Sequence, residues 1–354
     1  MSAPGRPKHE LPHGGTARSA KGADMSAPGR PKRELPHGGT ARSARSRQRG
    51  AALLLAMIIL TLITTLAAGM VWQQWRAIQV EAAERARTQS AWILTGALDW
   101  ARLILREDAR SQQRVDHLGE PWAVPLAEAR LSSFLAADKQ NNADDGSGPD
   151  AFLSGSIADV QARYNLFRLR SKPGQPNTEE VMVVQRLCEV VGVPAATAQQ
   201  IAQQLQAAWD GSDDAPVLPQ SVEQLAWLKI DPNDLKRLQP FVTLLPTSTT
   251  VNLNTAPREV LAAVIAGIDV GTAERLVQSR QRDPFTALEN VTAVVPGIQL
   301  KADLVGVSSE YFEVQGQVRL GDRVLQERSL VFRRSATETV VLRRERVNLH
   351  ADGT

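Results

Sequence analysis

The feature that most constrains this chain is an uncharged apolar segment that runs from Ala51 to Gln74. It contains no charged side chain and no proline, and the first charge after it is Arg76. As a helix the segment would be about 35 Å long, which is enough to cross the hydrocarbon core of a bilayer. Basic side chains crowd the residues just before it, so this side is predicted to stay in the cytoplasm. We therefore expect a single-pass anchor at residues 51–75, with the rest of the chain exported.

Two nearly identical segments, Met1–Ala20 and Met25–Ala44, precede the anchor and differ only at His9 and Arg33. Both are rich in glycine, proline, serine and basic residues, and this composition predicts disorder. A recent duplication, or a misplaced start with Met25 as the initiator, explains the repeat. A basic tail that binds nucleic acid is the alternative. In either case the segment is left out of the fold prediction.

Gly50 stands between the basic leader and the apolar run. This arrangement resembles a type IV prepilin leader, which prepilin peptidase cuts after the glycine before methylating the new N-terminal residue. The resemblance implies cleavage between Gly50 and Ala51, and N-methylation of Ala51. A cleavable secretory signal is the alternative, with the small residues Ala67–Gly69 as its cleavage site.

Most pilin-like subunits carry glutamate at the fifth mature position, where this chain has Leu55. That departure resembles the K-type minor pseudopilins of type II secretion. In other subunits this glutamate commonly pairs with the amino terminus of a neighbour, which offsets part of the cost of burying both charges. A subunit with nothing above it has no such amine to neutralise. Leu55 therefore predicts a place at the tip of the filament, and simple packing against lipid is the alternative.

The apolar run continues into an amphipathic helix, because no proline occurs between Pro36 and Pro121. Apolar residues recur at helical spacing on one face, with charged residues on the other. The predicted apolar face consists of Val80, Ala83, Ala86, Ala91, Leu94, Leu98, Ala101 and Leu105. One long helix, with its first half in the membrane and its second half packed on a head, is the expected arrangement.

Several later segments resemble the head of K-type pseudopilins. Asp99–Leu105 and Val115–Ala123 are similar to two of its motifs, and Gly155–Leu166 is similar to its first strand, although Phe167 follows where the family has another residue. The resemblance extends roughly from Arg49 to Phe332. Trp122, beside Pro121, is interpreted as a packing residue after the long helix.

Helical periodicity and proline breaks characterise the chain from Glu179 to Gly297. Two similar units lie there, Gly192–Leu205 and Gly267–Arg280, and each is followed by a helix-start signal, at Ser221 and at Thr286. Alternation returns after Lys301: residues 310–320 and 323–332 predict a hairpin around Gly321-Asp322, and residues 339–342 predict another strand.

These patterns predict an α+β fold. A pilin-like long N-terminal transmembrane and stalk helix packs on an antiparallel sheet, and a large all-α domain of helix-hairpin-helix or SAM-like type is inserted. The predicted divisions are a duplicated, cleaved leader at 1–50, the transmembrane helix at 51–75, the stalk and first part of the head at 76–175, the inserted α-helical domain at 176–300, and the C-terminal β part of the head with the tail at 301–354.

The hairpin around Gly267 suggests a rival function, an exported membrane-anchored DNA receptor. Such hairpins grip phosphates with backbone N–H groups. Asp269 would repel a phosphate, and the few arginines that follow are interrupted by acidic residues. The net charge of +3 is dominated by the leader, so no basic footprint for nucleic acid remains in the mature chain.

No constellation of catalytic residues supports an enzyme. The only cysteine, Cys188, lies in an apolar stretch with no histidine near it, and is predicted to be a buried core residue. Asp116, His117 and Glu120 are close in sequence, but they lack a second histidine or a cysteine at metal-ligand spacing. We expect a non-enzymatic protein that requires no cofactor.

Two acidic loops raise the question of calcium, which binds several oxygen ligands on flexible loops. One is Asp138–Asp150, interpreted as a solvated loop. The other contains Asp210, Asp213 and Asp214, and neither has the EF-hand pattern. The family resemblance implies calcium in the head, so these three aspartates are the candidate ligands.

The resemblance further implies a structural minor pseudopilin that caps the tip of the periplasmic pseudopilus. Its expected partners are the I-type and J-type minor pseudopilins, prepilin peptidase and the inner-membrane secretion platform. Its expected location is the bacterial inner membrane, with the N-terminus cytoplasmic and the head periplasmic.

Overall fold

The computed structural model describes residues 47–110, 114–132, 151–171, 177–211, 214–321 and 323–347. The chain divides into two compact units, Met1–Gln73 and Gln74–Thr354, the second of which is called the head below. The duplicated leader up to residue 46 and the acidic loop at 133–150 lie outside the described ranges.

In the first unit, the described residues belong to helix α1 (Arg47–Asp108). Within the described part of the chain, α1 is the one helix long and apolar enough to span a membrane, with mean hydropathy 2.5 over its most apolar window. Three of its polar side chains bond to the helix itself: the hydroxyls of Thr61, Thr64 and Thr65 each donate to a backbone carbonyl one turn earlier, at 2.9 Å. No partner outside the helix is needed for these groups, which suits an apolar environment.

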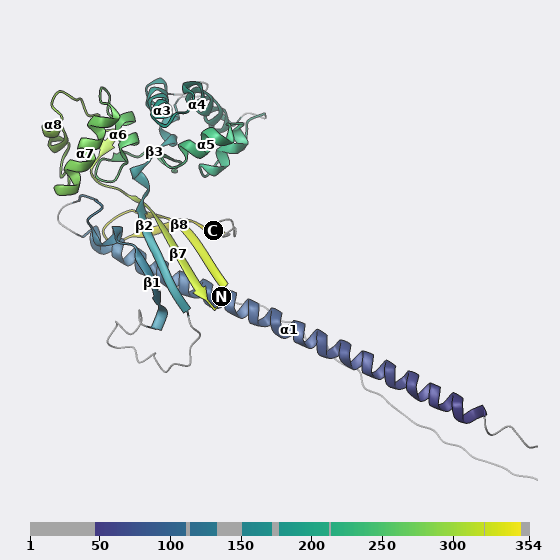
Figure 1. The fold of residues 1–354 in the computed structure, drawn as a ribbon. Coiled ribbons are helices and arrows are strands. Elements are labelled where there is room, and N and C mark those ends of the chain that lie inside the picture. The colour runs from purple at the N-terminus through teal and green to yellow at the C-terminus, as the bar shows by residue number, and fades with distance from the viewer. Residues whose placement is uncertain are drawn as a thin grey trace, which may run out of the picture. The chain divides into compact units, whose positions relative to one another are not determined.

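The head contains one antiparallel sheet assembled from both ends of the head sequence (Figure 1). Its strands, in spatial order, are β1 (Leu126–Arg130), β2 (Ala151–Asp159), β7 (Tyr311–Leu320), β8 (Arg323–Arg333) and β9 (Thr339–Val347). The predicted hairpin is confirmed, since Leu320 pairs with Arg323 across the turn and Tyr311 with Phe332 at the far end. The last strand is longer than the predicted residues 339–342.

The part of α1 that belongs to the head packs on this sheet through one face. Leu94, Leu98, Ala101 and Leu105 are all buried, as the periodicity predicts. The prediction is wrong for Val80, which is 58% exposed. The reason is the length of the sheet. The buried face of α1 begins only at Ser90, near the turn that joins β7 and β8.

Glycines allow this close packing. A Cβ atom on Gly316 would lie 3.0 Å from Cδ2 of Leu94, and a Cβ atom on Gly155 would lie 2.7 Å from the backbone oxygen of Gln315. Gly155 and Gly316 are paired across β2 and β7. The sheet surface under α1 therefore depends on these two residues having no side chain.

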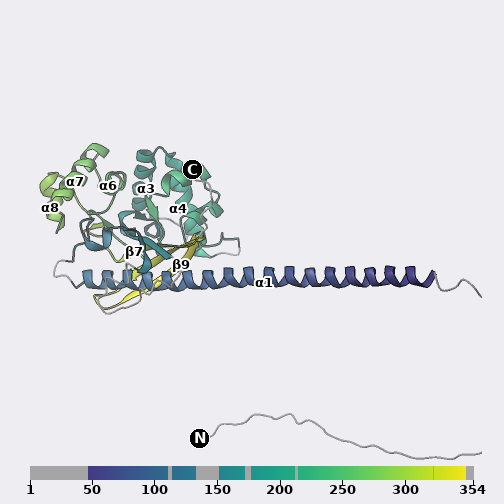
Figure 2. The same ribbon diagram turned by 60° about the horizontal axis from the view of Figure 1, so that its bottom comes forward.

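Between β2 and β7 the chain forms a helical block with its own apolar core, at one end of the strands (Figures 1 and 2). Two short parallel strand pairs, β3–β4 and β5–β6, belong to this region. Its elements are β3 (Tyr164–Asn165), α3 (Thr178–Val191), α4 (Ala195–Asp210), α5 (Pro232–Leu238), β4 (Val242–Thr243), β5 (Val251–Asn252), α6 (Arg258–Val264), α7 (Val270–Arg282), α8 (Leu288–Val294) and β6 (Val305–Gly306), with 3₁₀ turns at Pro121–Ala123, Val160–Ala162, Leu166–Leu169 and Glu223–Leu228.

Three local expectations need correction. The strand expected at Gly155–Leu166 begins earlier and ends at Asp159, because the Asp159 carboxylate accepts from the N–H of Gln161 at 2.7 Å and starts a 3₁₀ turn. This strand, β2, is also not the first strand of the head, because β1 precedes it in the chain. The signal at Ser221 introduces a 3₁₀ turn rather than an α-helix. At the start of α8, Asn290 Oδ1 accepts the hydrogen bonds, from Thr286 and Ala287, so the threonine is not the cap.

Candidate functional site

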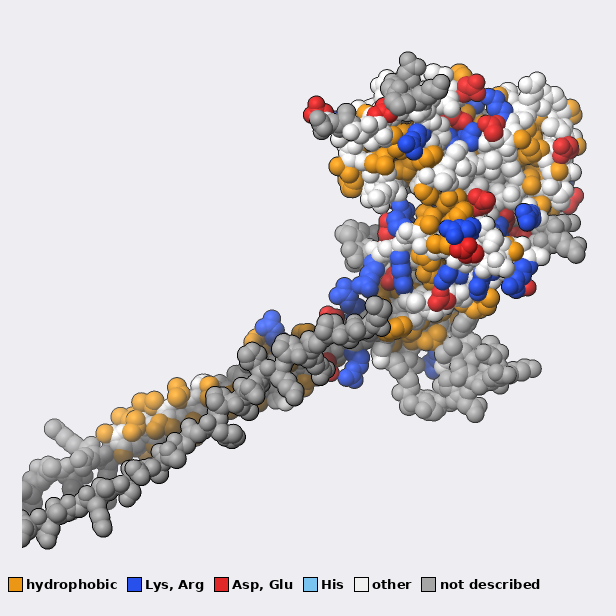
Figure 3. Space-filling view, turned by 180° about the vertical axis from the view of Figure 1, so that it is seen from behind, with side chains coloured by type: hydrophobic (Ala, Val, Ile, Leu, Met, Phe, Trp, Pro, Cys, Tyr) orange, Lys and Arg blue, Asp and Glu red, His pale blue; other side chains and the backbone are white. Residues whose placement is uncertain are grey.

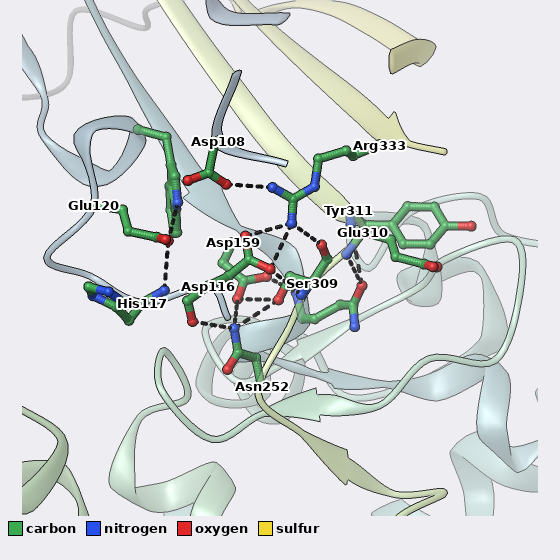
Figure 4. Close-up of polar contacts among 12 residues, drawn as sticks. Asp108, Asp116, His117, Glu120, Asp159, Asn252, Ser309, Glu310, Tyr311 and Arg333 are labelled. Atoms are coloured by element: carbon green, nitrogen blue, oxygen red, sulfur yellow. Dashed lines mark hydrogen bonds and ion pairs between the residues drawn. The ribbon is translucent and has the colours of Figure 1, made fainter. Parts of the chain in front are cut away.

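A cluster of buried polar side chains joins the end of α1, the sheet and the helical block (Figure 4). We call it the polar junction, and it consists of Asp108, Asp116, Asp159, Asn252, Ser309 and Arg333. Asp108 is the last residue of α1, Asp159 ends β2, Asn252 ends β5 and Arg333 ends β8. Because the ends of these elements meet here, the cluster connects α1, the sheet and the helical block.

Asp159 links the sheet to the helical block. Its Oδ2 accepts hydrogen bonds from the Asn252 side chain at 3.0 Å, from Ser309 at 2.6 Å and from Thr255 at 2.6 Å. Burial raises the pKa of Asp159, and the hydrogen bonds from Ser309 and Thr255 oppose that rise. Asn252 also donates to the backbone oxygen of Asp116 at 3.0 Å, so one amide group bridges the loop after α1 and the end of β2.

Arg333 is the positive charge of the junction. Its Nη1 donates to Asp108 Oδ2 at 2.6 Å, and its Nη2 lies 2.5 Å from Asp116 Oδ1 and 2.7 Å from Asp116 Oδ2. The same Nη2 donates to the backbone oxygen of Ser309 at 2.7 Å, and the guanidinium group lies 4.8 Å from the ring centre of Phe312. Only 10% of the Arg333 side chain and 2% of the Asp116 side chain are exposed. This is a desolvated ion pair with its hydrogen bonds satisfied.

A fourth carboxyl group, that of Glu120, completes the junction on the side of the loop. Its Oε2 accepts from the Trp122 indole N–H at 2.7 Å and from the backbone N–H of His117 at 2.9 Å. Trp122 is 1% exposed and packs edge-to-face on Phe312, with the ring centres 5.3 Å apart. The interpretation of Trp122 as a packing residue is confirmed.

Carboxylate oxygens of Asp108, Asp116 and Glu120 lie within 4.8 Å of one another. The guanidinium group of Arg333 pairs directly with two of them, Asp108 and Asp116.

In the sequence, Asp159 lies inside the segment Gly155–Leu166 that predicts a strand, and no pattern singles out Asn252 or Arg333. The local signal for Asp159 is that an aspartate stands where the alternating pattern stops. No local pattern marks Arg333, because its two carboxylate partners are more than two hundred residues away in sequence.

The predicted processing residues lie in α1, within the first unit. Gly50, Ala51 and Leu55 are all exposed, Leu55 at 59%. Cleavage after Gly50 stays a prediction.

Of the three candidate calcium ligands, the structure describes Asp210 and Asp214. Asp210 is the last residue of α4 and its Oδ1 accepts from Gln206 Nε2 at 2.8 Å. Asp214 is exposed in the following turn, and Asp213 lies outside the described residues, as does the whole Asp138–Asp150 loop. Aspartate oxygens are ligands that calcium prefers, so the donor chemistry fits, and the site stays a prediction.

In the hairpin between α6 and α7, the Asp269 Oδ1 accepts from the backbone N–H of Thr272 at 2.7 Å. This carboxylate caps α7 and takes the place at the helix N-terminus that a phosphate would need. On the face of the helical block seen in Figure 3, basic and acidic side chains are interspersed. Both observations weigh against this hairpin as a phosphate-binding surface.

Cys188 is confirmed as a buried core residue, with no exposed surface. Burial raises the pKa of its thiol to about 12, so the thiol stays protonated at neutral pH and is a poor nucleophile.

Comparison with known proteins identifies the family. Two family models described as type II secretion system protein K match residues 162–247 and 251–314. Type II secretion system protein K of Pseudomonas aeruginosa is 30% identical over 310 residues, covering 79% of this chain and 87% of the relative. The protein of the same name from Pectobacterium carotovorum is 27% identical (81% and 93% covered), and that from Klebsiella pneumoniae is 28% identical (86% and 99% covered).

Among solved structures, the fold is similar to a chain of the GspK–GspI–GspJ complex from the type 2 secretion system of enterotoxigenic Escherichia coli. The TM-score is 0.58 at 18% identity, with 75% of this chain and 98% of that chain covered. The long apolar helix, the antiparallel sheet and the helical block between its strands agree with that similarity. The identity to the Pseudomonas protein over most of both chains shows that this chain belongs to the type II secretion system protein K family of minor pseudopilins.

Proposed function

We propose that this pseudopilin caps the tip of the periplasmic pseudopilus and binds the I-type and J-type minor pseudopilins there. The observation that carries the proposal is membership of the protein K family. The fold similarity to a chain of the GspK–GspI–GspJ complex supports it. Leu55 and the helical block add physical support: Leu55 cannot pair with a neighbour's terminal amine, and the block adds bulk where a further subunit would stack.

The surface for these partners is proposed on the outer face of α1. Trp92 is 72% exposed and Leu103 is 48% exposed, and they lie three helical turns apart on the same side of the helix. Exposed large apolar side chains aligned in this way are typical of helix–helix contacts. The buried face of the same helix, at Leu98 and Leu105, is already occupied by the sheet.

The test mixes the head with I-type and J-type heads at micromolar concentration. We expect one complex of one-to-one-to-one stoichiometry in size-exclusion chromatography. Leu103→Glu should weaken it roughly tenfold or more, because a charge would be buried in an apolar contact. In the full-length proteins, Leu55→Glu should leave the complex intact, because its contacts lie in the heads. Separate elution of the wild-type heads would contradict the tip assignment.

We also propose that α1 anchors the protein in the inner membrane with the leader in the cytoplasm, and that prepilin peptidase cuts between Gly50 and Ala51. The apolar character of α1 and the basic leader support this orientation. Mass spectrometry of the mature protein should find a methylated Ala51 at the N-terminus. Cleavage near Gly69, or an intact leader, would contradict it.

No cofactor is proposed for the structural role itself. Calcium at Asp210, Asp213 and Asp214 remains a proposal that the oxygen-rich composition of the loop supports. Millimolar calcium should raise the melting temperature of the wild-type head, and should raise that of Asp214→Asn less. The absence of any shift in the wild type would end the proposal.

A further inference from the structure

Four carboxyl groups surround a single guanidinium group in the polar junction. Asp108, Asp116, Glu120 and Asp159 contribute the carboxyls, and Arg333 pairs directly with Asp108 and Asp116. If all four were ionised, Arg333 would balance only one of four negative charges in a largely desolvated site. Such an arrangement favours the retention of a proton.

The geometry shows which two carboxyl groups can share that proton. Carboxylate oxygens of Asp108 and Glu120 lie within 4.8 Å of each other, and Arg333 pairs with Asp108. Two carboxyl groups this close in a largely desolvated site favour the state in which one of them carries a proton. Glu120 is also the acceptor for the Trp122 indole and for the backbone N–H of His117.

We propose that Asp108 and Glu120 share one proton and act as a pH-sensitive latch between the end of α1 and the loop that carries Trp122. With the proton in place, the last residue of α1 is tied to Glu120 as well as to Arg333. Without it, two adjacent carboxylates repel each other, and the loop is released from the helix end.

Titration in the neutral range is supported by the environment. Burial, and then the charge of Glu120, raise the pKa of Asp108 to about 7, against the opposing effect of Arg333. Burial also raises the pKa of Glu120. A cavity of about 250 Å³ beside Asp108 gives solvent access for proton exchange. The charged and titratable groups that face the latch are Asp116, His117 and Arg114 from the loop, Arg333 and Arg334 from the end of β8, Glu310 before β7, and Asp159 from β2.

The sign of the effect follows from linkage. The folded head holds the Asp108 proton more tightly than the unfolded chain, whose aspartate pKa is 3.8. The stability from the latch is therefore complete below that value and is lost as the pH rises through about 7. The proposal does not depend on the partners suggested above, and only its physiological relevance rests on the periplasmic location.

The Trp122 indole N–H is a built-in reporter, because it donates to Glu120. We would label the tryptophans of the mature full-length protein in detergent with ¹⁵N, assign the Trp122 indole resonance with Trp122→Phe, and follow it between about pH 5.5 and 8.5. The wild-type resonance should titrate with a midpoint near pH 7. Asp108→Asn should abolish that titration.

Two controls separate the latch from its neighbours. Glu107→Gln changes an adjacent helix residue whose side chain is 69% exposed, and it should leave the titration unchanged. His117→Asn removes the nearby imidazole, and the titration should also persist. A variant Glu120→Gln should remove the titration even if Asp108→Asn does not fold. An indole resonance that is constant over this range, or that titrates equally in Asp108→Asn, would overturn the proposal, as would a titration lost only in His117→Asn.

Discussion

Replacing Arg333 with alanine should lower the free energy of unfolding of the head by about 3–5 kcal/mol, because it removes one partner of a buried ion pair. The Asp116 carboxylate, 2% exposed, would be left without its guanidinium group, and the backbone oxygen of Ser309 would lose a donor. Chemical denaturation at neutral pH measures the loss. The loss should be smaller near pH 5, where Asp108 keeps its proton and presents less unpaired charge.

The neighbouring residue provides the control for this experiment. Arg334 pairs with Glu338 at 2.8 Å, but its side chain is 57% exposed, so Arg334→Ala should cost less than about 1 kcal/mol. Equal losses for the two variants would show that the junction contributes no more than a surface ion pair.

Replacing Trp122 with alanine should destabilise the head by a similar amount, about 3–5 kcal/mol, through the cavity that it leaves. Trp122 is 1% exposed, contacts Phe312 edge-to-face and donates to Glu120. The cavity would open under α1, next to Leu105, which is completely buried. The melting temperature and the denaturant midpoint both report this loss.

Trp92 is the matched control, because it is a tryptophan of the same head on the exposed side of α1, with 72% of its surface exposed. Trp92→Ala should change the stability of the head by no more than about 0.5 kcal/mol. Its effect is expected only in complexes with partner heads. A stability loss for Trp92→Ala as large as that for Trp122→Ala would contradict the exposure of Trp92 and the burial of Trp122.

The helical hairpin at Gly267 illustrates how far local chemistry could be predicted. The carboxylate of Asp269 predicts that a phosphate would be repelled. In the structure this carboxylate accepts a hydrogen bond from the backbone N–H of Thr272. The strand prediction at Gly155–Leu166 was wrong about where the strand ends, because a side-chain hydrogen bond decides it. Alternation alone does not reveal that Asp159 ends the strand by accepting from Gln161.

The sequence by itself determined the elements whose signal is local. The apolar run of α1, the β7–β8 hairpin, the buried stripe from Leu94 to Leu105 and the burial of Cys188 all follow from periodicity and composition over neighbouring residues. The family resemblance, carried by short motifs in order, is of the same kind, and it was confirmed.

Only the tertiary structure decided the polar junction and the limit of the buried face of α1. Arg333 meets Asp108 across 225 residues of sequence, and Asn252 meets Asp159 across 93. A buried polar contact of this kind depends on where distant elements end, and no periodic pattern encodes it. The same holds for Val80, whose apolar side chain fits the helical stripe but has no sheet beneath it.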